Sequence, residues 1–139
     1  MARLIALDAN VLIAVTDERD SHHQAAKSLL AEHLDRELVI GSVNLAEVLV
    51  GPARVGRVEQ TLMHLSRVGV TELPLPGGAA PRLAVLRAST GLKMPDCCVL
   101  LTAQHARAAV ATFDRRLRAA ARSLGLAVLP DDDDPDPRS

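Results

Sequence analysis

The chain has 139 residues, a length at which one domain with its own hydrophobic core is the usual outcome. It contains no Trp or Tyr and one Phe, which excludes recognition of single-stranded nucleic acid by stacking bases on several exposed aromatic rings. The formal net charge of −1 combines residues 1–130, with 15 basic and 12 acidic side chains, and a tail at 131–139 with five acids and one arginine.

Short apolar runs alternate with segments of helical periodicity. In chain order, the predicted elements are a strand at 3–7, a helix at 22–34, a strand at 38–40, helices at 42–50 and 55–68, a strand at 70–75, helices at 82–89 and 95–107, a strand at 109–113, a helix at 115–123 and a strand at 126–129. This alternation predicts an α/β fold with a parallel sheet and right-handed crossovers.

Several helix details follow from local residue types. Ser21 and Ser42 are expected to cap the helices that they precede, and Gly51 with Pro52 is expected to end the second one. Leu34 completes the apolar face of the first helix. The third helix is predicted to place five residues on one face: Val55, Val58, Leu62, Leu65 and Val68. The acidic tail at 131–139 cannot bury apolar area and is expected to be disordered.

Four acids occupy notable positions. Asp8 directly follows the first strand and Asp114 the fourth, and ligands of open parallel sheets bind outside the carboxyl ends of the strands. Glu47 lies among apolar residues, and Asp96 lies in a first helical turn, next to free backbone N–H groups. Taken singly, each acid also fits an ordinary turn, cap or solvent-facing position. Together they predict that four carboxylates converge on one crevice.

Such a group of carboxylates would repel each other and take up protons unless a cation neutralised them. Oxygen ligands favour Mg²⁺ or Mn²⁺, whereas zinc is usually bound by His or Cys, and the five histidines form no zinc pattern. The adjacent Cys97 and Cys98 have no spacing for a metal or an ordinary disulfide. We interpret them as small buried side chains in a reducing, cytoplasmic compartment.

Other activities lack their motifs. The sequence has no GxSxG, GxGxxG or GxxxxGK[ST] pattern, so nothing indicates a serine hydrolase or a nucleotide-binding loop. No apolar stretch is long enough to span a bilayer, and an acid interrupts the N-terminal apolar run. We therefore expect a soluble protein without a signal peptide.

Four segments now suggest a family. LDANVLIAVTD at 7–17, GSVNLAEVLVG at 41–51, MPDCCVLLTA at 94–103 and ATFDRRL at 111–117 resemble, in order and spacing, the motifs of PIN-domain nucleases, in particular VapC-type toxins of bacterial type II toxin–antitoxin pairs. The resemblance implies a three-layer α/β/α sandwich over residues 1–130, with a central, mostly parallel sheet of four to five strands.

The resemblance also implies roles for residues. Asp8, Glu47, Asp96 and Asp114 would form the catalytic metal site for Mg²⁺ or Mn²⁺. Asn10 and Thr112 would support it, although family members often have Ser or Thr where Asn10 stands. The implied activity is metal-dependent endonucleolytic cleavage of structured RNA, such as transfer or ribosomal RNA, which inhibits translation. The implied partners are a second copy of the chain and a small antitoxin whose C-terminal segment covers the active site.

Positive charge for binding RNA phosphates is concentrated near two of the acids. Lys93 precedes Asp96, and Arg115 and Arg116 follow Asp114. A wider basic rim is predicted to include Arg87, Arg107, Arg118 and Arg122. If the four acids are set apart as metal ligands, residues 1–130 keep 15 basic and 8 acidic side chains.

Two alternatives stay open at this point. The first is a non-nucleolytic α/β module, such as a receiver-like signalling domain. Such domains need an acceptor Asp after the third strand and a Lys near the last strand, whereas this chain has LPLPG after its third strand and no lysine beyond Lys93. The second is a PIN fold that has lost catalysis and only binds partners. Loss of RNA cleavage in the presence of chelator would separate the nuclease from both.

Overall fold

The computed structural model describes residues 3–131 and contains a five-stranded parallel sheet in the order β3-β2-β1-β4-β5. The strands are β1 Leu4–Leu7, β2 Glu37–Gly41, β3 Val70–Leu73, β4 Ala109–Ala111 and β5 Val128–Leu129. The helices are α1 Ala9–Thr16, α2 His23–Glu32, α3 Ser42–Arg54, α4 Val58–Arg67, α5 Ala79–Thr90, α6 Met94–Ala106 and α7 Arg115–Ser123. The predicted α/β class and parallel sheet are confirmed.

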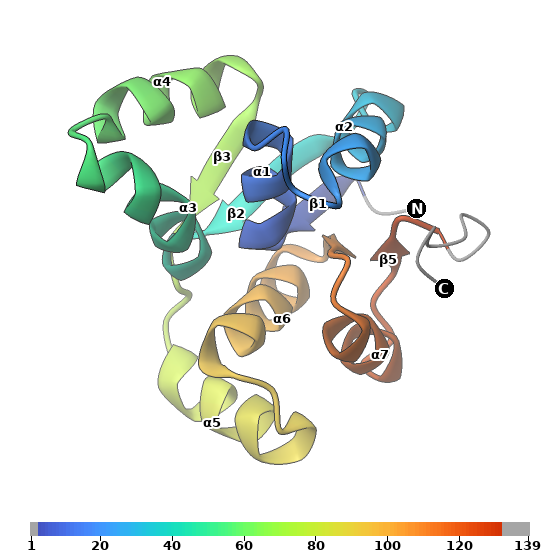
Figure 1. Ribbon diagram of the computed structural model, residues 1–139. Coiled ribbons are helices and arrows are strands. Elements are labelled where there is room, and N and C mark those ends of the chain that lie inside the picture. Colours follow the sequence, from blue (N-terminus) through green and yellow to red (C-terminus); the bar gives the residue numbers. More distant parts are fainter. Residues whose placement is uncertain (1–2, 132–139) are drawn as a thin grey trace.

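Two layers of helices cover the sheet, with α1 to α4 on one face and α5 to α7 on the other (Figure 1). Because successive residues of a strand point to opposite faces, the central strand contributes to both cores. Ile5 and Leu7 pack with α1, α2 and α3, whereas Ala6 packs with α6 and α7. The expected three-layer α/β/α sandwich is therefore present.

The strand order determines where the two strand-following acids lie. β1 pairs with β2 on one side and with β4 on the other, with Leu7 opposite Ala111. Asp8 and Asp114 therefore leave the same edge of the sheet from neighbouring strands, as predicted. The helix α3 also begins at this edge, directly after β2.

The first predicted helix is shorter than expected. α2 begins at His23, with His22 as N-cap and no side-chain cap, so the prediction of Ser21 as the cap is wrong. The carboxylate of Asp20 accepts a hydrogen bond from the His22 N–H (2.8 Å) and holds this turn instead. α2 ends at Glu32, and Leu34 beyond it is 85% exposed, so Leu34 is not part of the core.

The other helices differ from the prediction mainly at their ends. α1 lies between the predicted strand at 3–7 and the predicted helix at 22–34, where no element was predicted, and it directly follows Asp8. Ser42 is the first residue of α3 rather than its cap, and its hydroxyl donates to Glu72 (2.5 Å). α3 continues past Pro52 to Arg54, since a proline near the end of a helix removes only one hydrogen bond.

The predicted apolar face of α4 is only partly buried. Leu65 is in the core and Val58 is half-buried, whereas Leu62 and the flanking Val55 and Val68 are exposed. Within residues 3–131, no helix is both long and apolar enough to cross a membrane. The tail predicted to be disordered lies outside the described residues, apart from Asp131.

Candidate metal centre at the carboxyl edge of the sheet

Asp8 lies at the centre of the site. It follows β1, serves as the N-cap residue of α1 and is 5% exposed. Its N–H donates to the carbonyl of Ala111 (3.0 Å), which ties it to the end of β4. Burial raises the pKa of the Asp8 carboxyl, and the charges of Glu47 and Asp114 raise it further, while the Thr112 hydroxyl and the backbone of Asn10 lower it. Keeping the Asp8 carboxyl ionised in the folded protein therefore costs free energy.

Thr112 connects two of the acids. Its side chain is fully buried, and its hydroxyl donates to Oδ2 of Asp8 (2.7 Å) while it accepts from the N–H of Asp114 (3.1 Å). Because a hydroxyl has one proton, these two bonds fix its direction and leave Asp8 as the acceptor. Thr112 thus has the supporting position that the resemblance implied. Asn10 is exposed in the first turn of α1.

Asp114 is the N-cap of α7, and its Oδ1 accepts a hydrogen bond from the N–H of Leu117 (2.9 Å). This is the ordinary capping role that its position also allowed. The second carboxylate oxygen has no such bond to the helix, and the charge of Asp114 raises the pKa of both Asp8 and Asp96. Asp114 therefore combines a cap with a place among the clustered acids.

The buried side chain of Asn44 positions Glu47, and the sequence analysis did not predict this role. Asn44 is 1% exposed, and its Nδ2 donates to Oε1 of Glu47 (3.3 Å) and to the carbonyl of Pro95 (3.0 Å). It thereby joins α3 to the first turn of α6, where Asp96 lies. The sequence does contain a signal for this role. Asn44 is a polar residue within an apolar run, and because it lies three positions before Glu47 it is on the same side of the helix.

The pKa of Asp96 is strongly shifted from its ordinary value. It lies in the first turn of α6 and is half-buried. Its pKa rises from 3.8 to about 6, chiefly through desolvation and then through the charges of Asp8, Asp114 and Glu47, while Lys93 lowers it. The charges of the other three predicted acids therefore reach Asp96. That the four carboxylates converge on one metal site stays a prediction.

The donor set is compatible with a hard divalent cation. It offers carboxylate oxygens without a His or Cys ligand, and the repulsion among the acids is what a cation would relieve. Within residues 3–131, no three acidic, His or Cys side chains are already placed as a metal-binding group. Mg²⁺ keeps several waters and often takes only one or two carboxylates, so these residues fit a water-rich site rather than a closed cage.

The basic rim is smaller than the sequence suggested. Lys93, Arg115 and Arg116 are exposed, and the Arg116 guanidinium lies against Gly91 in the connection between α5 and α6. Arg118 instead donates to the carbonyls of Thr112 (2.9 Å) and Pro130 (2.6 Å).

Two further arginines do not belong to this rim. Arg87 donates to the carbonyls of Gly91 and Leu92, so its guanidinium holds the α5–α6 connection. Arg107 precedes β4 and lies at the opposite edge of the sheet from Asp114, which follows it. Their sequence separation of seven residues spans the whole strand, which is why proximity in sequence gave the wrong prediction.

The remaining candidate groups have structural positions. Cys97 and Cys98 are both free and buried, and desolvation raises the pKa of each thiol, which suits small core side chains and not a nucleophile. The only phenylalanine, Phe113, stacks on the ring of His22 with centroids 4.5 Å apart. This contact joins the loop before α2 to the loop that carries Asp114.

Comparison with solved structures supports this architecture. The chain resembles a toxin–antitoxin complex from Klebsiella pneumoniae, with 29% identity, a TM-score of 0.69, and coverage of 83% of this chain and 90% of that chain. VapBC2 from Rickettsia felis, bound to a DNA fragment from its promoter, shares 17% identity with a TM-score of 0.64, covering 90% and 96%. Mycobacterium tuberculosis VapC20, described as a Sarcin-Ricin loop cleaving toxin, shares 16% with a TM-score of 0.62, covering 84% and 94%.

A comparison with curated proteins found no match. The last two structures show a common fold, and the first adds closer sequence similarity. Residues 5–123 match the family model described as PIN domain, and this segment contains all four clustered acids. The chain belongs to the PIN-domain family.

Proposed function

We propose that this protein is a Mg²⁺- or Mn²⁺-dependent endoribonuclease toxin of a toxin–antitoxin pair, which cuts RNA phosphodiester bonds and inhibits translation. The observation that carries the proposal is the half-buried Asp96 at the carboxyl edge of a PIN fold, whose pKa is raised to about 6 by burial and then by the charges of Asp8, Asp114 and Glu47. The similarity to a toxin–antitoxin complex at 29% identity supports it.

The four acids would hold one or two divalent ions. A bound ion supplies a water of lowered pKa and stabilises charge on the attacked phosphate. Thr112 keeps Asp8 oriented by its 2.7 Å hydrogen bond, and Asn44 keeps Glu47 close to the first turn of α6. Asp96 or Asp114 would orient the attacking water or accept its proton. The expected products carry a 5′-phosphate and a 3′-hydroxyl.

The substrate would be structured RNA, such as transfer or ribosomal RNA. Lys93, Arg115 and Arg116 flank the acids and would contact phosphates on either side of the cleaved bond. The resemblance to VapC20, whose description names the Sarcin-Ricin loop, favours RNA as the polymer. The chain offers few aromatic side chains for base stacking, so recognition would depend on charge and shape.

Two protein partners complete the proposal. The antitoxin would cover the acid cluster with its C-terminal segment. A second copy of the chain would pack on the surface formed by α3 and α4, where five large apolar side chains are exposed: Val50, Val55, Leu62, Met63 and Val68. Apolar side chains gathered in this way commonly mark an interface.

The test is cleavage of a transfer RNA transcript by the purified protein with Mg²⁺ or Mn²⁺, with and without EDTA. We expect cleavage that stops with EDTA and is lost in Asp8→Asn and Asp96→Asn, whereas Glu59→Gln, in the first turn of α4, cleaves like the wild type. Cleavage that persists in EDTA would refute metal dependence. Absence of cleavage with metal, in protein that still binds its antitoxin, would indicate a catalytically silent PIN fold.

A further inference from the structure

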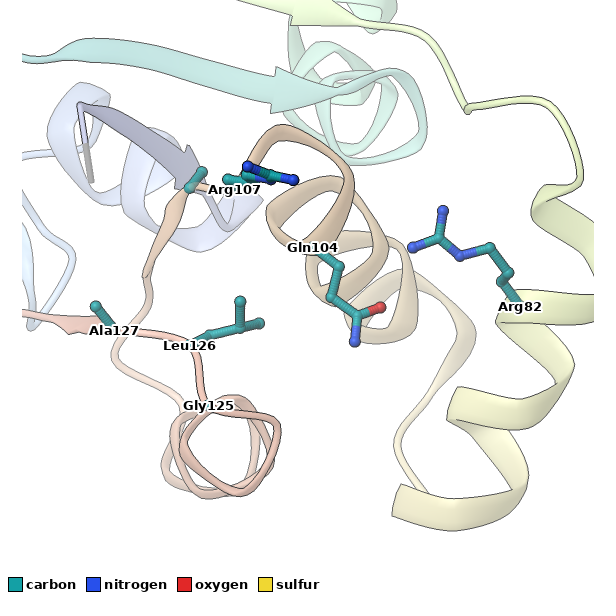
Figure 2. Close-up of a pocket in the computed structure, with 7 residues that line it drawn as sticks. Arg82, Gln104, Arg107, Gly125, Leu126 and Ala127 are labelled. Atoms are coloured by element: carbon teal, nitrogen blue, oxygen red, sulfur yellow. The ribbon is translucent and has the colours of Figure 1, made fainter. Parts of the chain in front are cut away.

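A second polar site lies far from the acids. A groove of about 720 Å³ is lined by Arg82 of α5, Gln104 and Arg107 at the end of α6, and residues 108 and 125–127. Figure 2 shows Arg82 extending from α5 toward α6, with Gln104 and Arg107 extending from the last turn of α6 and the backbone at 125–127 below them. Three separate elements therefore contribute to one groove.

The groove lies at the edge of the sheet opposite the acids. Ala108 and Ala127 directly precede β4 and β5, so these residues mark the amino ends of the strands. The acids lie at the carboxyl ends. Along α6, Asp96 and Gln104 are eight residues apart, which corresponds to about 12 Å at 1.5 Å per residue. The groove is thus separate from the acid cluster.

Among the described residues that line the groove, none is an acid that would neutralise its positive charge. In the part of the chain that the structure describes, residues 3–131, the ion pairs are Arg19 with Asp17 and His22 with Asp20, and neither involves Arg82 or Arg107. Both arginines are exposed, and the adjacent Gln104 adds an amide that can donate hydrogen bonds. Such a group selects an anion with several acceptor oxygens.

The backbone at Arg107 provides an independent argument. Six described residues have positive φ, and five of them are glycines at positions 56, 69, 78, 91 and 125. Arg107, with φ 55°, is the sixth and ends α6 in the left-handed conformation, where glycine or asparagine is usual. A side chain with a Cβ is strained there. The backbone strain at Arg107 motivates assigning a binding role to its guanidinium.

We propose that Arg82, Gln104 and Arg107 bind a phosphate of the RNA backbone and so form a second RNA contact, remote from the cleavage site. This inference rests on the proposed function for the identity of the polymer. Arginine forks match phosphate geometry, and arginine and amide side chains are among the groups that position nucleic acids without reading their sequence. The rise of about 12 Å along α6 between Asp96 and Gln104 equals about three to four steps of one strand at 3.4 Å each, a length that a folded RNA readily spans.

The experiment measures binding of a transfer RNA transcript by fluorescence anisotropy in EDTA, across a series of NaCl concentrations. The variants are Arg82→Ala, Arg107→Gly and the double variant, and the matched control is Arg67→Ala, an exposed arginine in the last turn of α4. Arg107→Gly removes the guanidinium at a position that glycine prefers, so we expect it to melt no lower than the wild type. Binding is measured without cleavage, so a failure of the nuclease proposal would not affect the result.

We expect each substitution in the groove to weaken RNA binding by about five- to tenfold at 0.1 M salt, and the double variant to flatten the dependence of log K on log salt by about one to two. Arg67→Ala should change affinity by less than about twofold. Equal affinities and salt slopes for the double variant and the control would overturn the proposal.

Two further probes distinguish other anions. Inorganic phosphate is expected to stabilise the wild type against heat more than the double variant. A phosphate effect combined with unchanged RNA binding would assign the groove to small anions and overturn the RNA contact. Polyglutamate binding that falls in the double variant while RNA binding does not would assign it to an acidic protein instead, with the same consequence.

Discussion

Removing one negative charge from the acid cluster should stabilise the metal-free protein. Asp96→Asn preserves the shape of the side chain and removes a carboxylate whose pKa is about 6 in the folded chain and 3.8 when unperturbed. Since the folded-state pKa is the higher one, the folded protein binds the proton more tightly. Stability therefore falls as the pH rises from about 3.8 to about 6, and above pH 6 the whole penalty is present.

The magnitude follows from the same two values. At about 1.4 kcal/mol for each unit of pKa, the rise from 3.8 to about 6 corresponds to an upper limit of about 3 kcal/mol. Asp96 is only half-buried, so solvent screening reduces this to about 1–2 kcal/mol. The neutral side chain also loses a favourable interaction of about 0.5 kcal/mol with the N-terminus of α6. We expect a net gain of about 1 kcal/mol, or roughly 2–4 °C in Tm for a chain of this size.

The assay is urea unfolding in EDTA at pH 7.5 and at pH 4, followed by thermal unfolding with Mg²⁺. Asp96→Asn should be more stable than the wild type at pH 7.5, most of the difference should vanish at pH 4, and Mg²⁺ should stabilise the wild type more. Glu59→Gln is the matched control, because Glu59 is also a first-turn acid but is exposed on α4. A variant that is less stable than the wild type at pH 7.5, or equally shifted at both pH values, would refute the argument that burial and the neighbouring charges destabilise the ionised Asp96.

Three further predictions concern other parts of the chain. In Gly41→Ala, the new Cβ would lie 2.6 Å from Oγ1 of Thr102, so urea unfolding should show a loss of about 1–3 kcal/mol that Thr102→Ala partly restores; an unchanged stability would contradict this packing. Thr112→Val removes the hydroxyl that donates to Asp8, so the free energy of unfolding should fall by about 1–3 kcal/mol and calorimetry should show weaker Mn²⁺ binding. An unchanged Mn²⁺ affinity would contradict the role of Thr112. Met63→Glu should change monomer stability by less than about 0.5 kcal/mol yet convert a dimer to a monomer in light scattering, and a dimer that persists would place the interface elsewhere.

The sheet and the acids were predictable because they depend on local patterns. Apolar runs followed by acids indicated strands whose carboxyl ends carry Asp8 and Asp114, and the pairing of β1 with β4 then brings them together. Glu47 stood out as a charge among apolar residues and Asp96 as a first-turn acid, and the resemblance to PIN-domain nucleases then assigned all four acids to one metal site. In the folded chain the charges of the other three raise the pKa of Asp96.

The contacts that depend on tertiary structure were not predictable. The bond from Asn44 to the carbonyl of Pro95 joins residues 51 positions apart, and no local pattern indicates it. Arg118 and Arg87 appeared to be phosphate ligands because they are basic and near the acids in sequence, but their guanidinium groups bind backbone carbonyls. Leu34 fitted the helical period, yet α2 ends two residues before it.

The central proposal is that the carboxylates of Asp8, Glu47, Asp96 and Asp114 form a site for a divalent metal ion. Its most direct test is anomalous diffraction from crystals of the wild-type protein soaked in Mn²⁺, with Asp96→Asn crystals soaked in the same way. We predict an anomalous peak among Asp8, Asp96 and Asp114 in the wild type that is lost or strongly reduced in the variant. A wild-type crystal with no peak at these residues, from protein that cleaves RNA under the same Mn²⁺ concentration, would contradict it.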